Sequence, residues 1–405
     1  MKISNLKGKN FRNLKEFEFK PHEHLNFIIG KNAQGKTSVL EAIHYLSNLK
    51  SFRQGKPHQV MRWKEKNTEI KCGLDFLGSD GEAWNSEHEI VFRRETETEE
   101  RVQKTALINK NPVRSSLDYI GKKHLPSGSG FHAITFNPSD HELIRGEPQL
   151  RRNFINAALA SQDPDYLREL KRYIRSLQQR NALLKQEPFL REETLLNSFS
   201  EDLIEAGSVL THKRLEWFQL LLDYFNKVIK NIAPKQPFLD LVYESNWIPS
   251  KPAFRFSYKE LKEGHFSGQD TLPSLEQIKQ AFRQRVLMLR PLEQKLRVSL
   301  VGPHRDDWMF YQEKHPIQSH GSQGEVRTIL LALKLSEMHI YESFTGLKPI
   351  LLLDDFSSEL DKDRRTHLLE FLTRTDLQVF VTSTEDLPIE GKRFLVSDGN
   401  LRELN

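Results

Sequence analysis

The sequence predicts an α/β fold with a mainly helical segment inserted into it. Near the N-terminus, the short apolar run LNFIIG leads through a glycine-rich loop into a helical pattern. Near the C-terminus, the apolar runs PILLLDD and LQVFVTST flank the helix-like segment DRRTHLLEFLTRT. Strand, helix and strand in that order form a βαβ unit with parallel strands. We therefore expect the two ends of the chain to form one domain around a parallel sheet.

Composition bounds the class of protein. The chain has 405 residues, enough for two or three cores. Its 60 basic and 55 acidic residues give a net charge of +5, which permits nucleic acid or acidic partners without requiring them. It has no run of about 18 apolar residues and no apolar signal core in MKISNLKGKNFRNLK. The single cysteine, Cys72, excludes an internal disulfide and a multi-cysteine metal site. We expect a cytoplasmic protein without a membrane anchor.

The spacing of apolar residues changes twice in the first hundred residues. Phe17 and Phe19 alternate with charged neighbours, as in a strand. After Lys36 the apolar residues follow the spacing of one helical face, at Val39, Leu40, Ile43 and Leu46. From 68 to 108 the pattern returns to period two, with Ile70, Cys72, Leu74 and Phe76 on one side. Such alternation is typical of an antiparallel sheet with one wet face.

The middle of the chain, from 147 to 300, is rich in Lys, Arg, Glu, Gln and Leu and is predicted to be mostly helical. One apolar stripe is expected along Leu167, Leu170, Ile174, Leu177 and Leu184. The section between Pro234 and Pro273 is irregular and is expected to be a loop-rich insert. We predict a discontinuous head of residues 1–146 and 296–405 and an inserted, mostly helical arm or lid domain of residues 147–295.

The loop that follows LNFII has the composition of a phosphate-binding loop. Gly30, Gly35, Lys36 and Thr37 satisfy the pattern G-x-x-x-x-G-K-[ST]. Lys36 can reach the β- and γ-phosphates of a nucleotide, and the Thr37 hydroxyl can join the shell of a Mg²⁺ ion. A chance Gly-Lys-Thr is disfavoured, because the string lies between a strand and a helix whose N-terminus attracts anions. The predicted nucleotide contacts are Gly30, Lys31, Asn32, Ala33, Gln34, Gly35, Lys36 and Thr37.

Two aspartates end the buried strand of ILLLDDF. Asp354 is placed to hold Mg²⁺, and Asp355 is the candidate to polarise an attacking water. Alternatively, two acids simply cap a strand at the surface. The upstream phosphate loop favours the first interpretation, because hydrolysis of a nucleotide needs both groups. The arm of Asp355 is shorter than that of a glutamate, so we expect any hydrolysis to be slow.

The stretch HGSQGEVRTILLALKL begins a second helix. Ser322 followed by Glu325 forms the pattern of a capping box, which is a purely structural interpretation. Ser322 and Gly324 also place a hydroxyl and a backbone N–H at a positive helix end, which can bind an anion. Since the first loop already binds its own phosphates, this site suggests a γ-phosphate held by another subunit. Both interpretations are open at this point.

These elements carry a family resemblance. The loop GKNAQGKT, the stretch SQGEVRT and the string LLLDDFSSELD resemble the ABC-type ATPase heads of the SMC-like group, and within it the RecF family. FNPSDHELIRGEPQLRRNFI at 136–155 and VGPHRDD at 301–307 extend the resemblance over essentially the whole chain. One difference is that Glu325 stands where RecF-family signatures usually have Gln, and the general ABC signature LSGGQ is absent.

The resemblance implies an ABC-type ATPase head, with a Rossmann-like P-loop lobe, an antiparallel β lobe and a short helical arm. It implies ATP and Mg²⁺ as cofactors and an ATP-dependent homodimer. In that dimer Ser322 and Gly324 of one chain close over ATP held by Lys36 of the other, and Lys36, Asp355 and Ser322 support hydrolysis.

Further roles follow from the resemblance. Arg12, with Asn13, is implied to lie close to the phosphates, and Asp361 near the dimer seam. Thr382, Ser383 and Thr384 follow the last apolar strand, where either a γ-phosphate sensor or plain strand capping is expected. The stretch His304–Asp307 either braces its lobe through an Arg–Asp pair or contacts nucleotide.

RecF-family proteins couple DNA binding to slow ATP hydrolysis. The resemblance therefore implies a role in DNA replication, recombinational repair and the SOS response. It implies DNA at single-stranded/double-stranded junctions as a partner, together with RecR and RecO, and indirectly RecA, which is loaded at gaps.

The mildly basic insert offers candidate contacts to DNA. Basic side chains that meet phosphates bind without reading sequence, and no helix-turn-helix or zinc finger is found in the sequence. The alternative for each of them is a solvated helix face, because Glu147 and Glu169 dilute the charge. The candidates are Arg151, Arg152, Arg168, Lys171, Arg172, Arg175 and Arg180.

Other classes of protein fit less well. A transporter ATPase subunit needs a compact insert and an LSGGQ-like string, whereas the insert here is long and basic. A chromosome-structuring SMC protein needs hundreds of heptad residues, which are missing. The ATPase partner of a nuclease, or another SMC-like head, is harder to exclude. Cleavage by this chain itself is disfavoured, because the sequence lacks clustered carboxylates or histidines.

Overall fold

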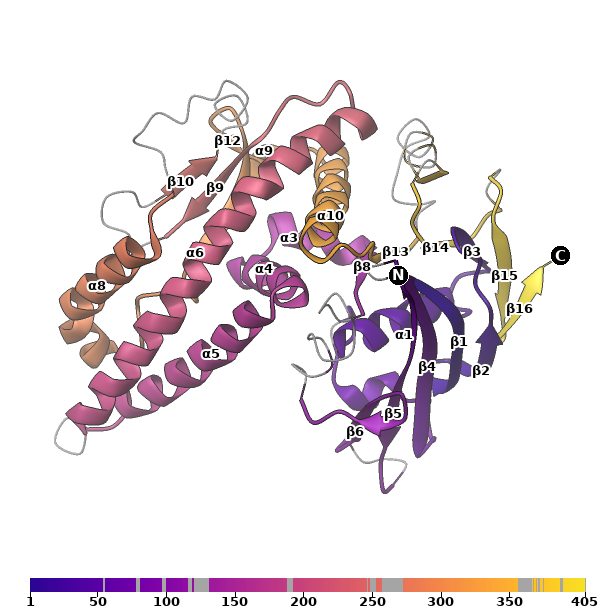
Figure 1. Ribbon diagram of the computed structural model, residues 1–405, viewed down its shortest axis with the longest axis horizontal. Helices are drawn as coiled ribbons and strands as arrows, with labels where there is room; N and C mark the ends of the chain where they lie inside the picture. Colours follow the sequence, from indigo (N-terminus) through magenta and orange to yellow (C-terminus); the bar gives the residue numbers. More distant parts are fainter. Residues whose placement is uncertain are drawn as a thin grey trace. The chain divides into compact units, whose positions relative to one another are not determined.

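The computed structural model describes two compact units (Figure 1). The first comprises Met1–Asp140, Val228–Pro234 and Arg327–Asn405, and the second comprises His141–Lys227 and Lys235–Val326. The described residues are 1–53, 55–77, 81–96, 100–115, 119, 131–187, 192–245, 247, 253–256, 272–355, 366, 368, 370, 372–373, 375–386 and 389–404.

A 12-stranded sheet organises the first unit, with strand order β7-β6-β5-β4-β1-β2-β16-β15-β3-β14-β13-β8 among the described residues. Its strands are β1 (Lys2–Phe11), β2 (Leu14–Phe19), β3 (Leu25–Ile29), β4 (Asn67–Leu77), β5 (Ala83–Arg93), β6 (Gln103–Ile108), β7 (Asn111–Pro112), β8 (Ala133–Phe136), β13 (Ile350–Leu353), β14 (Val379–Ser383), β15 (Lys392–Ser397) and β16 (Asn400–Leu404). The sheet contains strands from both ends of the chain, as predicted.

The parallel half of the sheet places three strand ends together. β14 lies between β3 and β13 and is parallel to both, with Ser383 opposite Ile29 and Val381 opposite Leu353. β8 and β15 extend this half in the same direction. The carboxyl ends of β3, β13 and β14 therefore meet at one edge, the edge at which open α/β sheets bind ligands. The predicted parallel pairing of PILLLDD with LQVFVTST is confirmed.

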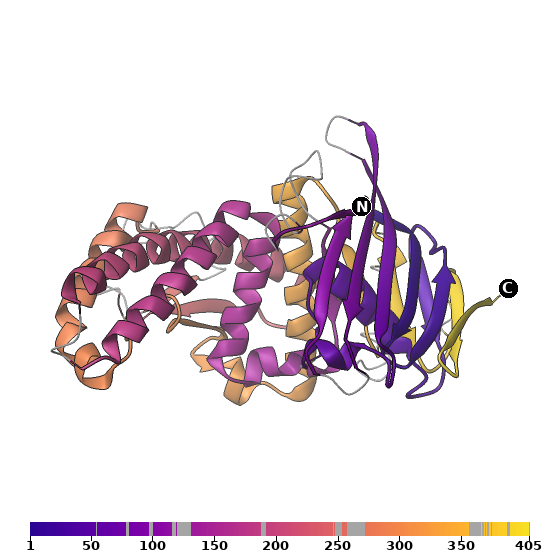
Figure 2. The ribbon, with the colours of Figure 1, turned by 90° about the horizontal axis from the view of Figure 1, so that it is seen from below.

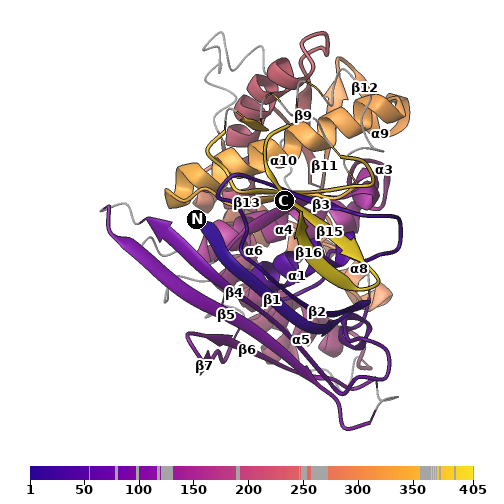
Figure 3. The ribbon, with the colours of Figure 1, turned by 90° about the vertical axis from the view of Figure 1, so that its right-hand side faces the viewer.

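The antiparallel half bears out the period-two pattern. β4 pairs with β1 and β5, and β5 pairs with β6 (Figure 3). Ile70, Cys72, Leu74 and Phe76 are buried, while their neighbours on the other face are exposed or half-buried. In Figure 2 the indigo and violet strands of this half lie side by side.

Helix α1 (Lys36–Asn48) begins directly after the glycine-rich loop, as predicted. Val39, Leu40, Ile43 and Leu46 are fully buried and pack in the main core cluster of the first unit. The helix contacts strands of both halves of the sheet, β8 and β14 on one side and β1, β4 and β5 on the other. Its N-terminus is thereby held at the edge where β3, β13 and β14 end.

The second unit is largely helical. Its helices are α3 (His141–Arg145), α4 (Pro148–Gln162), α5 (Pro164–Leu184), α6 (Glu193–Ile232), α8 (Leu275–Leu296), α9 (Ile317–His320) and α10 (Gln323–Thr345), of which α6 and α10 continue into the first unit. α5 and α6 run side by side in Figure 1, bridged by Arg172 with Asp202 and by Lys213 with Asp163. Asp163 also caps α5 by accepting the N–H groups of Asp165 and Tyr166.

The section between Pro234 and Pro273, expected to be loop-rich, contains two strands that its sequence did not predict. It contains β9 (Asp240–Glu244) and β10 (Ala253–Phe256), which form a four-stranded antiparallel sheet with β11 (Asp307–Gln312) and β12 (His315–Pro316). β9 pairs with β11, which lies far along the sequence, so no local turn signal announces the pairing. Residues 246, 248–252 and 257–271 of this section lie outside the described residues, as does most of DRRTHLLEFLTRT.

The predicted apolar stripe of α5 is correct except at Ile174. Leu167 and Leu184 are buried and Leu170 and Leu177 are half-buried, but Ile174 is 44% exposed. The buried face also contains Tyr166, Tyr173 and Arg180. Arg180 is only 1% exposed because its guanidinium donates to Glu293 at 2.6 Å and to Ser299 Oγ at 2.7 Å. Hydrophobic periodicity could not place a buried charge on that face. Within the described ranges, no helix combines the length and the apolar character needed to cross a bilayer.

The buried Arg180–Glu293 pair yields a stability prediction. Arg180→Met should lower the free energy of unfolding by about 3–5 kcal/mol, because it leaves Glu293 charged, buried and unpaired. Urea denaturation followed by circular dichroism measures the loss.

The exposed pair of Arg168 with Asp165 provides a matched control. Arg168→Ala should cost at most about 1 kcal/mol. The double variant Arg180→Met/Glu293→Met should be more stable than Arg180→Met alone. A single Arg180→Met variant as stable as wild type would contradict the assignment.

Candidate functional site

The glycine-rich loop has a backbone that only its glycines permit. Gly35 has φ +116°, and a Cβ there would lie 2.7 Å from Leu14 Cδ2 and 3.0 Å from Asn13 Oδ1. A Cβ on Gly30 would lie 2.5 Å from the Val396 carbonyl oxygen. Both glycines of the motif are therefore required by sterics, quite apart from any ligand.

Side chains from neighbouring segments hold this loop in place. Asn13 Nδ2 donates to the Ala33 carbonyl at 3.1 Å, and Ser38 Oγ donates to Asn13 Oδ1 at 2.9 Å. On the other side, the Asp398 N–H donates to Gln34 Oε1 at 2.7 Å. The loop is thus held in shape by the β1–β2 turn and the β15–β16 turn, which reduces the ordering cost of binding.

Lys36 points back along its own loop. Its ammonium donates to the carbonyl oxygens of Gly30 at 2.7 Å and Lys31 at 3.0 Å. Burial lowers the pKa of Lys36, while the nearby carboxylates of Asp354 and Asp355 oppose that shift. A phosphate oxygen is a stronger acceptor for this cation than a carbonyl.

The aspartates after β13 are hydrogen-bonded to the start of α1 and to the end of β14. Thr37 Oγ1 donates to Asp354 Oδ1 at 2.9 Å, and Thr382 Oγ1 donates to the same oxygen at 2.7 Å. Burial raises the pKa of Asp354, while the bonds from Thr382 and Thr37 lower it. Thr382 Oγ1 also accepts the N–H of Asp355, whose φ is +50°. The Thr382 hydroxyl therefore contacts both predicted acids: it donates to Asp354 and accepts from Asp355.

Thr37 and Asp354 together suit a magnesium ion. They offer a hydroxyl and a carboxylate, hard oxygen ligands of the kind Mg²⁺ takes, and the ion keeps waters and phosphate oxygens as its other ligands. In the parts of the chain that the structure describes, no group of three or more His, Cys, Asp or Glu could hold a metal. The residues present fit the predicted ion and not an all-protein metal cage.

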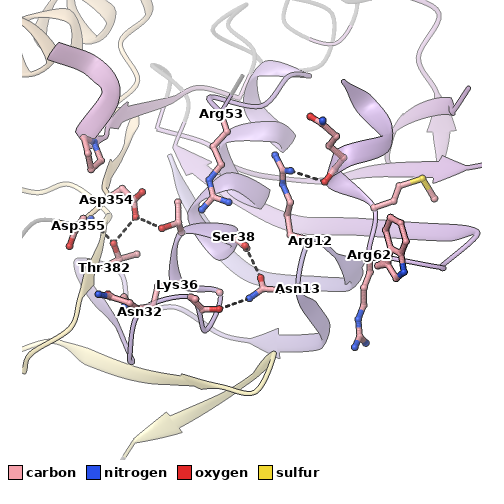
Figure 4. A pocket seen from close by; sticks show the side chains of 17 residues that line it. Arg12, Asn13, Asn32, Lys36, Ser38, Arg53, Arg62, Asp354, Asp355 and Thr382 are labelled. Carbon is pink, nitrogen blue, oxygen red and sulfur yellow. Dashed lines mark hydrogen bonds between the residues drawn. The ribbon is translucent and has the colours of Figure 1, made fainter. Parts of the chain in front are cut away.

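These side chains line one cavity of about 700 Å³ (Figure 4). Asp354, Asp355 and Thr382 lie on one side of the view, Arg62 lies on the other, and Asn13 and Arg12 lie between them. The full lining is Arg12, Asn13, Asn32, Ala33, Gly35, Lys36, Thr37, Ser38, Arg53, Gln59, Met61, Arg62, Trp63, Pro138, Asp354, Asp355 and Thr382.

Arg12 lines the cavity but is held by a residue that the sequence analysis missed. Its Nε donates to Glu41 at 3.0 and 3.1 Å, and its Nη1 donates to the Gln59 carbonyl at 2.7 Å. Glu41 is fully buried and also accepts from Ser51 Oγ at 2.6 Å. The sequence held one signal for Glu41, an acid in the middle of the apolar helical run VLEAI.

Helix α10 begins at the second predicted anion site. The Ser322 N–H donates to Glu325 Oε2 at 2.7 Å, and the Glu325 N–H donates to Ser322 Oγ at 3.2 Å, so the capping box is confirmed. Since Ser322 Oγ accepts in this box, its proton can still be donated to a ligand. Arg145 Nη2 supports the preceding turn by donating to the Gly321 carbonyl at 2.6 Å.

The stretch VGPHRDD forms part of a buried polar network in the second unit. Arg151 donates to both oxygens of Asp307 at 2.6 and 2.8 Å. Asp306 accepts from Tyr243 and from Trp247 Nε1, and burial raises the pKa of Asp306 to about 6. Of the two interpretations of this stretch, the bracing Arg–Asp pair is the one that these contacts support.

Burial corrects two of the predicted DNA contacts. Arg151 is 2% exposed and Arg180 is 1% exposed, each paired with a carboxylate. The expectation that they meet DNA phosphates is wrong, because a buried guanidinium cannot reach a ligand on the surface. Sequence composition could not distinguish these two from their exposed neighbours.

The remaining basic candidates differ in how strongly they are already engaged. Arg168 and Arg172 are exposed but paired with acids, and Arg152 donates to the Asp306 carbonyl. Lys171 and Arg175 are exposed, and neither forms an ion pair among the described residues. Asp361 lies outside the described residues.

Comparison with known proteins identifies the family. The sequence model of the RecF/RecN/SMC N terminal domain matches residues 2–396. The DNA replication and repair protein RecF of Halalkalibacterium halodurans is 34% identical over 385 residues, covering 95% of this chain and 93% of that protein. The chain belongs to the RecF family. A second RecF, from Bacillus cytotoxicus, is 33% identical over 384 residues, covering 95% of this chain and 92% of that protein.

Solved structures confirm the predicted fold class. The structure of the recombination mediator protein RecF-ATP in the RecFOR pathway has a TM-score of 0.82 and 29% identity, covering 100% of this chain and 98% of that one. The Smc head domain from Pyrococcus furiosus, at 15% identity and a TM-score of 0.54, covering 100% of this chain and 96% of that one, shares the fold. This RecF-family chain therefore has the α/β ATPase-head fold of the SMC-like group.

The anchoring of the RecF-family loop by Asn13 can be tested without any ligand. Asn13→Ala removes two hydrogen bonds, each worth about 1 kcal/mol. Amide hydrogen exchange in residues 30–36 should therefore speed up by about tenfold or more. Mass spectrometry of the ligand-free protein measures the rate.

Asn32→Ala is the matched control, since the described residues offer the Asn32 side chain no hydrogen bond. It should leave exchange nearly unchanged. Equal exchange in wild type and Asn13→Ala would show that the loop holds its shape without the hydrogen bonds of Asn13.

Proposed function

We propose that this RecF-family chain binds ATP with Mg²⁺ in the cavity at the ends of β3, β13 and β14. One observation carries the proposal: Thr37 and Asp354, which are far apart in sequence, are in direct contact at 2.9 Å beside Lys36. The solved RecF-ATP structure supports it, since that protein shares the fold at a TM-score of 0.82.

Different residues contact the phosphates, the Mg²⁺ ion and the attacking water. The N–H groups of the loop from Gly30 to Thr37 and the Lys36 ammonium hold the phosphates, and the Arg12–Glu41 pair supports the wall beside them. Thr37 and Asp354 hold Mg²⁺, which neutralises and orients the phosphates when bound. Asp355 orients the attacking water. Its short side chain makes hydrolysis slow, so the ATP-bound state is long-lived.

The bound state is proposed to be a homodimer. Ser322 of one chain donates its hydroxyl proton, and Gly324 its N–H, to the γ-phosphate held by Lys36 of the other chain. The capping box supports this role because it leaves the proton of Ser322 available. Glu325 takes the place of the usual family Gln here. Its carboxylate accepts the Ser322 N–H, so the negative charge is held in the helix cap.

The ATP-bound dimer is proposed to bind DNA without reading sequence. By analogy with RecF proteins of the RecFOR pathway, it would bind at single-stranded/double-stranded junctions, work with RecR and RecO, and assist RecA loading at gaps. Hydrolysis then resets it. The head of residues 1–146 and 296–405 would carry ATP, and the arm of residues 147–295 would carry Lys171 and Arg175.

Sedimentation with and without ATP tests the shared site. We expect a monomer without nucleotide and a dimer with MgATP at micromolar concentration. Lys36→Met should abolish both ATP binding and dimerisation, because it removes the cation that holds the phosphates. Analytical ultracentrifugation measures the mass, and calorimetry measures ATP affinity.

Ser322→Arg separates the two halves of the site. It should bind ATP like wild type but stay monomeric, since only the second subunit uses Ser322. A wild-type chain that binds ATP and remains monomeric, with and without DNA, would rule out the shared-site mechanism.

Salt dependence tests the DNA surface. Lys171→Glu/Arg175→Glu should weaken DNA binding and reduce the slope of log affinity against log salt by about 1.8, as two phosphate contacts are lost. Arg172→Gln is the control, because its guanidinium is already bound by Asp202 at 2.7 Å. Fluorescence anisotropy over a salt series gives the slopes. Unchanged slopes in the double variant would exclude these residues as contacts.

A further inference from the structure

One end of the cavity is lined by an aromatic side chain that the phosphate site does not use. Trp63 lines the cavity and is 82% exposed, the most exposed large apolar side chain among the described residues. Met61 and Arg62 line the same cavity beside it. A single exposed aromatic side chain needs no explanation by itself, but one that lines a ligand cavity does.

The turn that presents Trp63 is held in place on both sides. The Arg12 N–H donates to the Val60 carbonyl at 2.7 Å, and the Arg62 N–H donates to the Asn10 carbonyl at 2.8 Å. Met61 forms a β-bridge with Phe11. After the tryptophan, Arg94 Nε donates to the Glu65 carbonyl at 2.8 Å. The indole is therefore exposed on a backbone that is ordered before any ligand binds.

The cavity is polarised from one end to the other. Both of its acids, Asp354 and Asp355, lie on the side opposite Arg62 in Figure 4. The side with Arg62 and its sequence neighbours Met61 and Trp63 offers a cation, a thioether and an indole, and no carboxylate. A triphosphate with its terminal phosphate between Lys36, Thr37 and the acids would direct its nucleoside to the opposite side, past Asn13 and Arg12. The end that receives the base is the aromatic one.

We propose that Trp63 is the base-stacking residue of this site and that it favours a nucleoside triphosphate over a bare polyphosphate. The inference rests on the proposed binding of ATP in this cavity and adds the contact to the base. An indole stacks on the face of a purine and is indifferent to its edge, so adenine and guanine nucleotides should both benefit. The energy of the stack is added to that of the phosphates, whose contacts are independent of it.

The test compares two ligands that differ by the nucleoside, MgATP and magnesium tripolyphosphate. Trp63→Ala should weaken ATP binding by roughly 5- to 100-fold, the range for removing one base stack. It should leave tripolyphosphate binding within about twofold, because that ligand has no base. Trp63→Phe should recover most of the ATP affinity. Isothermal titration calorimetry measures both ligands.

Tryptophan fluorescence provides a second readout. ATP should quench the fluorescence of wild type and of Trp84→Phe but not of Trp63→Phe, and tripolyphosphate should quench none of them. Trp84 is the matched control, a half-exposed tryptophan on β5 that is absent from the lining of the ATP cavity.

The outcomes separate this inference from the proposed function. If Trp63→Ala binds ATP as well as wild type while Lys36→Met loses both ligands, stacking is excluded and the ATP site stands. Equal weakening of ATP and tripolyphosphate would also exclude stacking, since it would mean a damaged loop. A loss of DNA affinity without nucleotide, with ATP affinity unchanged, would assign Trp63 to DNA instead. Failure of wild type to bind either ligand would overturn both proposals.

Discussion

The insertion of β14 between β3 and β13 is the constraint on which the site depends. These three parallel strands come from opposite ends of the chain, and their pairing brings Gly30, Asp354 and Thr382 to one edge. The hydrogen bond from Thr37 to Asp354 can form only when that register is correct. A slip of one residue would turn every side chain to the other face and separate the two oxygens. The cavity is thus a consequence of sheet topology.

Buried ion pairs fix the positions of loops and helix ends that hydrophobic packing alone does not determine. Glu41 fixes the Arg12 guanidinium against the cavity wall, and Arg151 with Asp307 ties α4 to the start of β11. Replacing such pairs with apolar residues is often neutral for stability, but breaking one partner is costly. Their value here lies in position, because each fixes a loop or a helix end. The same argument covers Arg145, which holds the turn before Ser322.

The two predicted anion sites are built on the same principle. Each lies at the N-terminus of a helix, α1 after Gly35 and α10 after Ser322, where the helix dipole places positive potential. They differ in how the polar groups are used. The first loop is held through the Ala33 carbonyl and the Gln34 side chain, two contacts that use no backbone N–H of the loop. The second is closed by its own Glu325, and its hydroxyl proton remains.

The sequence by itself determined the elements whose information is local. The G-x-x-x-x-G-K-[ST] string, the helical face from Val39 to Leu46 and the alternation from Ile70 to Phe76 each follow from spacing within a few residues. Only the tertiary structure decided which polar residues meet. Glu41 with Arg12, Thr382 with Asp354, Arg180 with Glu293 and β9 with β11 all join segments far apart in the chain. Periodicity shows which way a side chain points along its own element, but the partner it meets depends on how distant elements pack, and no local pattern encodes that.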